Sequence, residues 1–293
     1  MVTEHDAARP SLRRRGAPSW RALSVVAIAA LGSAFLVDAH FIEPARLVVK
    51  REELHLPRLP PELVGLKVVL VSDLHVGSPH WGMPSLRALI ARINAEHPDL
   101  ILLAGDYLID DIPFGSRIEA RLVAKELGAL RAPSGVIGVL GNHDGWHGVP
   151  GLREELEAGG IQLLDDQVAR VEARGIGLVV LGLADEEVRR RSPSQELDLA
   201  PAGVPMLALV HEPDIFAELD ERPLLTLAGH THGGQVQLPL IGAPIVRSRY
   251  GQRYLGGHIV EHGRHLYVTT GVGTSVWPIR FGVPPEYVVL TLR

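Results

Sequence analysis

The chain has 293 residues, of which 46% are hydrophobic and 22% are charged, and its formal net charge is -5. This apolar content is enough for a sizeable core in one large domain or two small ones, and the mild charge gives no reason to expect nucleic-acid binding. The sequence has no cysteine, which excludes disulfides and thiolate-bound metals. Any metal ion must therefore be held by His, Asp, Glu or Asn. Many of the 14 histidines stand in short clusters flanked by glycine, which is a first hint of a metal site.

Residues 1–44 are predicted to form a basic N-terminus followed by a membrane-targeting segment. The uncharged run at 22–37 is slightly short for a spanning helix of about 20 residues. It is also slightly long for the apolar part of a signal peptide, roughly 7–15 residues. An uncleaved anchor is favoured over a cleaved export signal, because Val37-Asp38-Ala39 is a mediocre processing site. A twin-arginine signal fits the residues after the arginine pair poorly, and a buried core helix is a less favoured alternative.

The charges that flank this apolar segment favour one orientation in a membrane. Five arginines precede it and three basic residues follow it at a similar distance: Arg9, Arg13, Arg14, Arg15 and Arg21, then Arg46, Lys50 and Arg51. The positive-inside rule leaves the N-terminus in the cytoplasm. We therefore expect a single-pass membrane protein whose main domain is extracytoplasmic. Export after signal cleavage, and anchoring with the domain facing the cytoplasm, remain as alternatives.

Residues 45–293 are predicted to form one α/β domain. Apolar, β-branched runs at 66–73, 99–106 and 135–142 indicate buried strands, and they alternate with helical patterns at 84–96, 117–130 and 150–158. This alternation implies a sheet covered on both faces. The later half has more strand-like runs, which predict a second sheet packed on the first: 166–173, 176–183, 205–211, 224–229, 265–270 and 286–292. The stretches 186–200 and 239–264 are expected to be a surface loop and a long connection.

Five short polar blocks each follow directly on an apolar run. In order, they are Asp73-Leu74-His75, Gly105-Asp106, Gly141-Asn142-His143-Asp144, His211 and Gly229-His230-Thr231-His232. Taken singly, Asp-x-His and Gly-Asp are most often ordinary turns, and a lone His211 is more often structural. Ligands gather at the carboxyl ends of strands in α/β sheets, so the five blocks are expected to meet at one rim. Together they indicate a site rich in histidine and carboxylate.

The order and spacing of these blocks resemble the signature of the calcineurin-like metallophosphoesterases, from about residue 65 to the end. The resemblance implies a four-layer α/β/β/α sandwich with two metal ions per chain. It implies that Asp73, His75 and His232 hold the first metal, that Asn142, His211 and His230 hold the second, and that Asp106 bridges both. It also implies that His143 is not a ligand but faces the leaving group, with Asp144 as its possible support.

The chemistry of this set of ligands agrees with the resemblance. Oxygen and imidazole ligands together suit Mn, Fe, Zn or Co better than Ca or Mg. Two metals about 3.5–4 Å apart can stabilise both the attacking and the leaving oxygen of an in-line displacement, and they make hydroxide available near neutral pH. We therefore expect hydrolysis of a phosphoester by direct attack of hydroxide, with a protonated His143 assisting the leaving oxygen.

The sequence departs from the protein Ser/Thr phosphatase branch of the family. Ile109 stands where that branch has an aspartate, and no arginine follows Gly-Asn-His. The chain looks more like the small bacterial membrane-anchored branch, whose members are regarded as phosphodiesterases or as pyrophosphatases. Some of these act on lipid-linked nucleotides such as UDP-2,3-diacylglucosamine. A phosphomonoesterase is the alternative activity, and a non-catalytic scaffold is less favoured because no motif residue is missing. Arg280, expected to be exposed near the rim, is a candidate for binding substrate phosphate; the alternative is that it pairs with a carboxylate and holds the tail.

Overall fold

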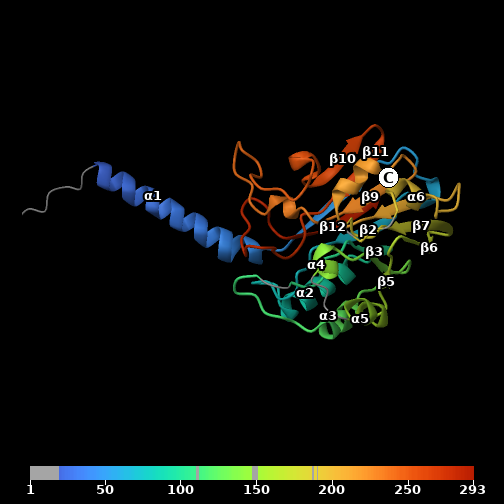
Figure 1. Cartoon of the computed structure of the whole chain (residues 1–293), viewed down its shortest axis with the longest axis horizontal. Helices are drawn as coiled ribbons and strands as arrows, with labels where there is room; N and C mark the ends of the chain where they lie inside the picture. The colour runs from blue at the N-terminus through green and yellow to red at the C-terminus, as the bar shows by residue number, and fades with distance from the viewer. Residues whose placement is uncertain (1–19, 110–111, 147–150, 187, 190) are drawn as a thin grey trace, which may run out of the picture. The chain divides into compact units, whose positions relative to one another are not determined.

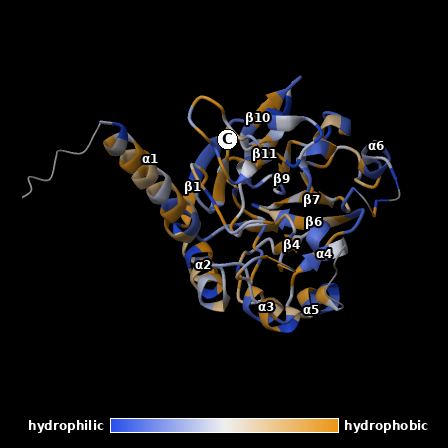
Figure 2. Ribbon diagram, turned by 60° about the vertical axis from the view of Figure 1, so that its left-hand side comes forward, coloured by the Kyte–Doolittle hydropathy of each residue, from blue (hydrophilic) through white to orange (hydrophobic). Residues whose placement is uncertain are grey.

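The structure is a computed structural model that describes residues 20–109, 112–146, 151–186, 188–189 and 191–293. The chain divides after Val37 into two units, which are described separately. In the first unit, helix α1 (Trp20–Val37) is apolar along most of its 18 residues (Figure 2). Its large apolar side chains, such as Ile28 and Leu31, are exposed, unlike those of a core helix. The stretch Leu23–Ala45 is long and apolar enough to cross a membrane, a test that signal sequences also pass.

Two six-stranded sheets form the second unit. The first has the order β1-β12-β2-β3-β4-β5, with parallel neighbours except for the antiparallel pair β12 and β2. Its strands are β1 (Val48–Leu54), β2 (Lys67–Val71), β3 (Leu100–Leu103), β4 (Val136–Gly138), β5 (Gln162–Leu163) and β12 (Glu286–Leu292). The register pairs Val69 with Ile101, and Ile101 with Val136.

The second sheet has the order β10-β11-β9-β8-β7-β6, with a parallel centre and an antiparallel pair at each edge. Its strands are β6 (Gln167–Ala173), β7 (Ile176–Gly182), β8 (Met206–Leu209), β9 (Leu225–Ala228), β10 (Gly257–Glu261) and β11 (Arg264–Val268). Residues from both sheets, including Leu102 and Leu207, form one buried cluster. The two sheets therefore pack face to face.

Helices cover the outer face of the first sheet. α2 (Met83–Ala95), α3 (Ala120–Leu127) and α5 (Leu152–Ala158) lie together beside β2–β5 (Figure 1). In α2, Leu86, Leu89 and Ile93 recur at helical spacing and are all buried. Among the described residues, short elements cover the second sheet: α6 (Pro193–Leu197) and the 3₁₀ segments Pro213–Glu218 and Gly251–Tyr254, which contribute Leu197, Phe216 and Tyr254 to its outer cluster. The predicted sandwich of two sheets between helical layers is confirmed, with one thin outer layer.

The structure also corrects two sequence expectations and adds one strand that the sequence analysis missed. The 186–200 stretch contains helix α6, which a capping box at Ser192 and Gln195 initiates. The 239–264 connection contains strand β10, whose half-buried pattern is weak because it lies at a sheet edge. Strand β1 was not predicted, because an edge strand tolerates its charged residues, Lys50 to Glu53.

Candidate metal centre and active site

The five polar blocks lie at the carboxyl ends of parallel strands from both sheets. Asp73 and His75 follow β2, and Asp106 follows β3. Asn142 begins the short helix α4 (Asn142–Trp146) after β4, His211 follows β8, and His230 and His232 follow β9. The structure therefore brings together all seven side chains that the sequence analysis assigned to metal binding. Asp73 and His232 are 159 positions apart in the sequence, and the packing of one sheet on the other brings them together.

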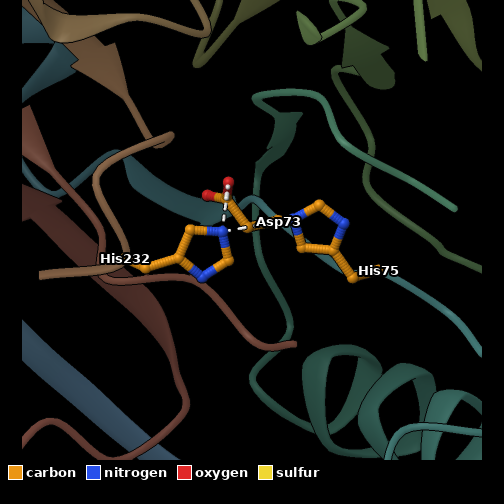
Figure 3. A group of neighbouring side chains, drawn as sticks. All are labelled: Asp73, His75 and His232. Carbon is orange, nitrogen blue, oxygen red and sulfur yellow. Dashed lines mark hydrogen bonds and ion pairs between the residues drawn. The ribbon is translucent and has the colours of Figure 1, made fainter. Parts of the chain in front are cut away.

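One group of donor atoms is centred on Asp73, His75 and His232. The Nε2 atoms of His75 and His232 lie 3.2 Å apart, and Asp73 Oδ1 lies 3.3 Å from Nε2 of His232. Figure 3 shows the Asp73 carboxylate and the His232 ring pointing toward one another, with the His75 ring beside them. Asp73 Oδ1 is buried, yet it accepts no hydrogen bond from the described residues. An orphaned carboxylate oxygen among ring nitrogens is the arrangement that a cation satisfies.

A second group of donor atoms comes from Asn142, His211 and His230. Asn142 Oδ1 lies 3.0 Å from Nε2 of His211 and 3.0 Å from Nδ1 of His230. The two ring nitrogens are 3.2 Å apart. Asp106 Oδ2 lies 3.5 Å from Nε2 of His75 and 3.3 Å from Nε2 of His211, so it belongs to both groups. The donor atoms thus divide into two sets that share one carboxylate oxygen.

Backbone carbonyls orient two of the imidazoles. Nδ1 of His211 lies 2.6 Å from the carbonyl oxygen of Ala104, and Nδ1 of His75 lies 3.4 Å from that of Leu108. When Nδ1 carries the proton and donates it to the carbonyl, Nε2 keeps its lone pair for a cation. In both residues Nε2 is the atom that faces the shared oxygen of Asp106.

Burial controls the charge of these groups. It lowers the pKa of His75 to about 3 and, together with the charge of His211, it lowers the pKa of His230 to about 3. Both rings are therefore neutral at pH 7 and able to offer a lone pair. Burial also lowers the pKa of His211, but the adjacent Asp106 outweighs it and raises that pKa well above the ordinary value. The same carboxylate that attracts a proton to His211 would attract a divalent cation.

Left-handed backbone conformation is concentrated at this rim. Asp73, His75, Asp106, His230 and His232 all have φ between 41° and 70°. Residues with side chains adopt this region at a cost of about 1–3 kcal/mol, and such residues cluster at functional sites. The turn occurs directly after each strand, and it aims the side chain into the rim.

Close backbone packing at the rim requires glycine beside Asp106. A Cβ atom on Gly105, which has φ 89°, would lie 2.6 Å from the amide nitrogen of Gly141 and 2.9 Å from Nδ1 of His211. Gly141 in turn packs directly against the Asp106 carboxylate. The glycines of Gly-Asp and Gly-Asn-His thus let two loops approach each other behind the donor atoms.

Asp144 fixes these two loops through their backbone. Its carboxylate accepts hydrogen bonds from the N–H groups of Asp106 (2.7 Å), Tyr107 (3.0 Å) and Gly141 (3.0 Å). Burial and the charge of Asp106 raise its pKa to about 7. Its observed contacts are therefore with the Gly-Asp and Gly-Asn-His backbones, rather than with the His143 ring that it was expected to support.

His143 stands at the edge of the donor set. Its backbone N–H donates to Asp106 Oδ1 at 3.0 Å, and its Nε2 lies 3.2 Å from Oγ of Ser275. The ring packs edge-on against that of His75, with centroids 5.1 Å apart. Burial lowers its pKa although Asp106 acts in the opposite direction. In the free site, burial thus acts against the protonated form that was expected from the sequence.

The expected exposure of Arg280 was wrong. Its side chain is completely buried, and its guanidinium donates to the carbonyl oxygens of Thr270, Gly271, Gly273 and Val283. It also lies 3.4 Å from Nδ1 of His232. Sequence alone could not distinguish an exposed arginine from one that the folded tail encloses. Arg280 holds the tail around the first donor group and is not available to solvent.

A different arginine, Arg247, is exposed at the mouth of the site. It lines two adjoining hollows together with His230, and one of these also contains Asn142. Its charge reaches His143, since it contributes to lowering the pKa of that ring. Within the described residues, no hydrogen bond or ion pair holds its guanidinium. Sequence analysis missed it because it lies in the long connection, with no motif around it.

Comparison with known proteins identifies the family. A model of the family described as calcineurin-like phosphoesterase matches residues 66–234. A metallophosphoesterase of Bacillus subtilis, YkuE, described as uncharacterized, is 33% identical over 87% of this chain and 88% of its own. The phosphodiesterase YaeI of Escherichia coli is 29% identical over 86% of this chain and 91% of its own. A zebrafish (Danio rerio) protein described as a transmembrane protein with metallophosphoesterase domain is 30% identical over 92% of this chain and 62% of its own.

The chain belongs to the calcineurin-like metallophosphoesterases. It is a phosphoester hydrolase of a family that uses divalent metals, and the Bacillus subtilis and Escherichia coli relatives are of similar length to this chain. The apolar helix and the relatives described as transmembrane proteins are consistent with membrane anchoring.

Proposed function

We propose that the protein hydrolyses phosphodiester or pyrophosphate bonds at a centre of two divalent metal ions. The observation that carries this proposal is the division of seven donor side chains into two sets that share Asp106. Asp73, His75 and His232 would hold one ion, and Asn142, His211 and His230 would hold the other. Mn, Fe, Zn or Co would suit this mixture of oxygen and imidazole ligands.

The bound ions would supply a hydroxide nucleophile near neutral pH and would neutralise charge on the phosphoryl group. The protein's own residues would do the rest. Asp106 would keep the two sets of ligands at a fixed separation, and the carbonyls of Ala104 and Leu108 would keep the rings of His211 and His75 in place. Direct attack of this hydroxide on phosphorus would require no covalent intermediate with the protein.

His143 would act on the leaving group. Its Nε2 is held near Ser275 at the edge of the donor set, and its backbone N–H is bound to Asp106. An anionic phosphoryl group in the site would raise its pKa and favour the imidazolium form. The imidazolium would then donate its proton to the departing oxygen. Arg247, exposed at the mouth with no observed partner among the described residues, would bind a non-bridging phosphate oxygen.

Hydrolysis assays with purified protein test the activity. We expect Mn-loaded protein to hydrolyse bis-p-nitrophenyl phosphate faster than p-nitrophenyl phosphate. The reverse preference would favour the alternative, a phosphomonoesterase. No hydrolysis of either compound by protein that binds two metals per chain would favour the non-catalytic scaffold. Less than one metal per chain after loading with Mn or Fe would contradict the dinuclear centre.

We further propose that the protein is a single-pass membrane protein with an extracytoplasmic catalytic domain. The support is the excess of arginine before the apolar segment and the length of Leu23–Ala45. Alkaline phosphatase fused after residue 60 is expected to be active, and a fluorescent reporter at the same place is expected to be dark. Fluorescence without phosphatase activity would indicate a cytoplasmic domain. A mature chain that begins at His40 would indicate an exported, cleaved protein.

A further inference from the structure

The hydroxyl of Ser275 meets the ring of His143. Its Oγ lies 3.2 Å from Nε2 of His143, in a hollow that His230 and His232 also line. Ser275 is 5% exposed, and among the described residues its hydroxyl has no other hydrogen-bond partner. The bond from the His143 backbone to Asp106 fixes where this side chain begins. The contact with Ser275 fixes where its far ring nitrogen lies.

Ser275 stands at the start of a strained turn. The N–H of Trp277 donates to the carbonyl of Ser275 at 2.7 Å, and Val276 between them has a φ of 64°. A hydrogen bond across one residue of positive φ is the rarer and more strained kind of γ-turn. For a β-branched residue such as Val276, this backbone conformation is a clear outlier. Strain of this kind persists only where the surrounding contacts over-determine the conformation.

A second turn of the same kind lies opposite, at Gln235. The N–H of Val236 donates to the carbonyl of Gly234 at 2.7 Å, and Gln235 between them has a φ of 57°. The side-chain amide of Gln235 joins the two turns: its oxygen accepts from the N–H of Ser275 at 2.7 Å, and its nitrogen donates to the Ser275 carbonyl at 2.9 Å. Gln235 is the third residue after His232, so the segment that carries proposed metal ligands also fixes Ser275.

This loop does not need the hydroxyl of Ser275. Gln235 and Trp277 bind only the backbone of Ser275, which any residue would offer. The loop also tolerates a buried hydroxyl without a partner, since Oγ1 of Thr274 has none among the described residues. A serine that only filled space would therefore not have to reach His143. The contact with Nε2 is what the hydroxyl itself contributes.

We infer that Ser275 is a positioning residue for His143, and that Gln235 in turn fixes Ser275. This inference rests on the proposed function, because it explains how the proton donor of that reaction is aimed. A hydroxyl suits the place, since it can accept one hydrogen bond and donate another. While His143 holds the proton, Oγ accepts from Nε2–H, and the leaving oxygen of a bound substrate shares this N–H.

The proton balance involves His143 and the leaving oxygen alone. When the bond from phosphorus to the leaving oxygen breaks, that oxygen takes the Nε2 proton. The hydroxyl of Ser275 then turns and donates its hydrogen bond to the ring nitrogen. Ser275 keeps its own proton throughout and forms no covalent bond.

The dependence of rate on the leaving group tests the inference. Methyl 4-nitrophenyl phosphate and methyl phenyl phosphate differ in how much their leaving oxygen needs a proton. The assay would use full-length, Mn-loaded protein in phosphatidylcholine nanodiscs, with the released phenol measured by chromatography. Ser275→Ala is expected to lower kcat for the phenyl ester by about 10- to 100-fold, because a misaligned acid loses part of its contribution. For the nitrophenyl ester kcat should fall by less than about 3-fold, and KM and metal content should stay unchanged.

A double-mutant cycle shows whether Ser275 acts through His143. Added to His143→Gln, Ser275→Ala should cost less than about 2-fold more, since the group it positions is already gone. Gln235→Leu removes both amide bonds and should reproduce the selective loss, so the cycle can be run with either variant. Thr274→Val is the matched control, because it removes a buried hydroxyl without a described partner from the neighbouring residue. It should keep the wild-type kcat for both esters.

The outcomes separate the inference from the proposed function. If the wild-type protein hydrolyses neither ester, the proposed function fails. If it hydrolyses them but Ser275→Ala and Gln235→Leu lose nothing, or lose equally for both esters, the function stands and the positioning role is wrong. Losses that multiply in the double mutant would likewise overturn the inference. A fall in metal content or in thermal stability with Ser275→Ala would assign the hydroxyl to the structure of the loop instead.

Discussion

The donor set and the exposed apolar side chains of nearby loops are built in opposite ways. We call Leu240, Ile241, Ile245, Val276 and Trp277 the apolar rim; the last three line a hollow together with His230 and His232. The proposed ligands follow strand ends, are largely buried, and are oriented by carbonyls such as that of Ala104. The apolar rim is carried by irregular loops, and its side chains are exposed. Left-handed backbone occurs in both regions, at Asp106 and at Leu240. In the donor set the strain directs polar groups inward, whereas in the rim it presents apolar groups to the outside.

This difference indicates how the two tasks are divided. Catalysis needs donor atoms held within a fraction of an ångström, and a rigid sheet provides that precision. Selection of the substrate needs a surface that can vary without disturbing the sheet, and loops provide it. Substitutions in the two regions should therefore have effects of different size and kind.

The largest effect is expected for Asp106→Asn. Asp106 Oδ2 lies near Nε2 atoms of both sets, and its charge is what attracts cations to His75 and His211. We expect both metals to be bound weakly and activity to fall by more than about 10³-fold, since metals supply several kcal/mol of stabilisation. His75→Ala is the comparison, because it touches one set only and should leave about one metal per chain. Metal content measured after desalting would show the difference, and equal loss in the two variants would contradict a bridging role for Asp106.

A smaller effect is expected for His143→Gln, at the boundary between the two regions. The variant should keep its metals and lose about 10²–10⁴-fold in activity. The loss should be greater for alkyl esters than for nitrophenyl esters, because nitrophenolate leaves without protonation. An equal loss for both esters would reduce His143 to an electrostatic role. Loss of metal would make His143 a ligand, which its place among His75 and Asp106 also permits.

The sequence predicted the donor set far better than the rim. Asp73, Asp106 and His211 follow strands that apolar runs reveal, and the topology of an α/β sheet then brings strand ends together. The strands predicted at 66–73 and 99–106 extended too far at their C-terminal ends, because Asp73 and Asp106 already have left-handed backbone conformation. Hydrophobicity does not encode that conformation. Arg280 illustrates a further limit, since its burial depends on how the tail folds around Thr270 to Gly273.

The rim was not predicted because no periodic pattern marks it. The hydrophobic residues Leu240 and Ile245 stand among Gly and Pro in a segment expected to be a plain connection. Hydrogen bonds between residues far apart in the sequence, such as those of Gln235 with Ser275, position the loop that carries Val276 and Trp277. Arg247 escaped notice for the same reason, since only its position beside His230 gives it a role.

Arg247→Ala should affect binding more than turnover. A charged hydrogen bond to phosphate contributes about 1.5–3 kcal/mol, so kcat/KM is expected to fall about 10- to 100-fold, mainly through KM. Arg247→Lys should recover part of the loss, because it keeps the charge without the planar fork. Arg249→Ala is the control: Arg249 is also exposed and lines one of the same hollows, but it is paired with Glu186 at 2.6 Å. Steady-state kinetics on bis-p-nitrophenyl phosphate would distinguish the two arginines, and similar losses in both would argue for a general effect of charge.

The smallest effect, and one of opposite sign, is expected for Leu240→Asn. Leu240 lies at the tip of a tight turn closed by reciprocal hydrogen bonds between Leu238 and Gly242, both 2.9 Å, and its side chain is fully exposed. Its removal therefore costs no core packing, while asparagine tolerates φ of 69° better than leucine does. The free energy of unfolding, measured by denaturant titration, should rise by up to about 1 kcal/mol. Ile241→Asn, which makes the same change in polarity at a neighbouring exposed residue without positive φ, should leave stability unchanged. If Leu240→Asn instead destabilised the protein, the Leu240 side chain would have to pack on the domain in solution rather than stand exposed, and the strain argument for this turn would be wrong.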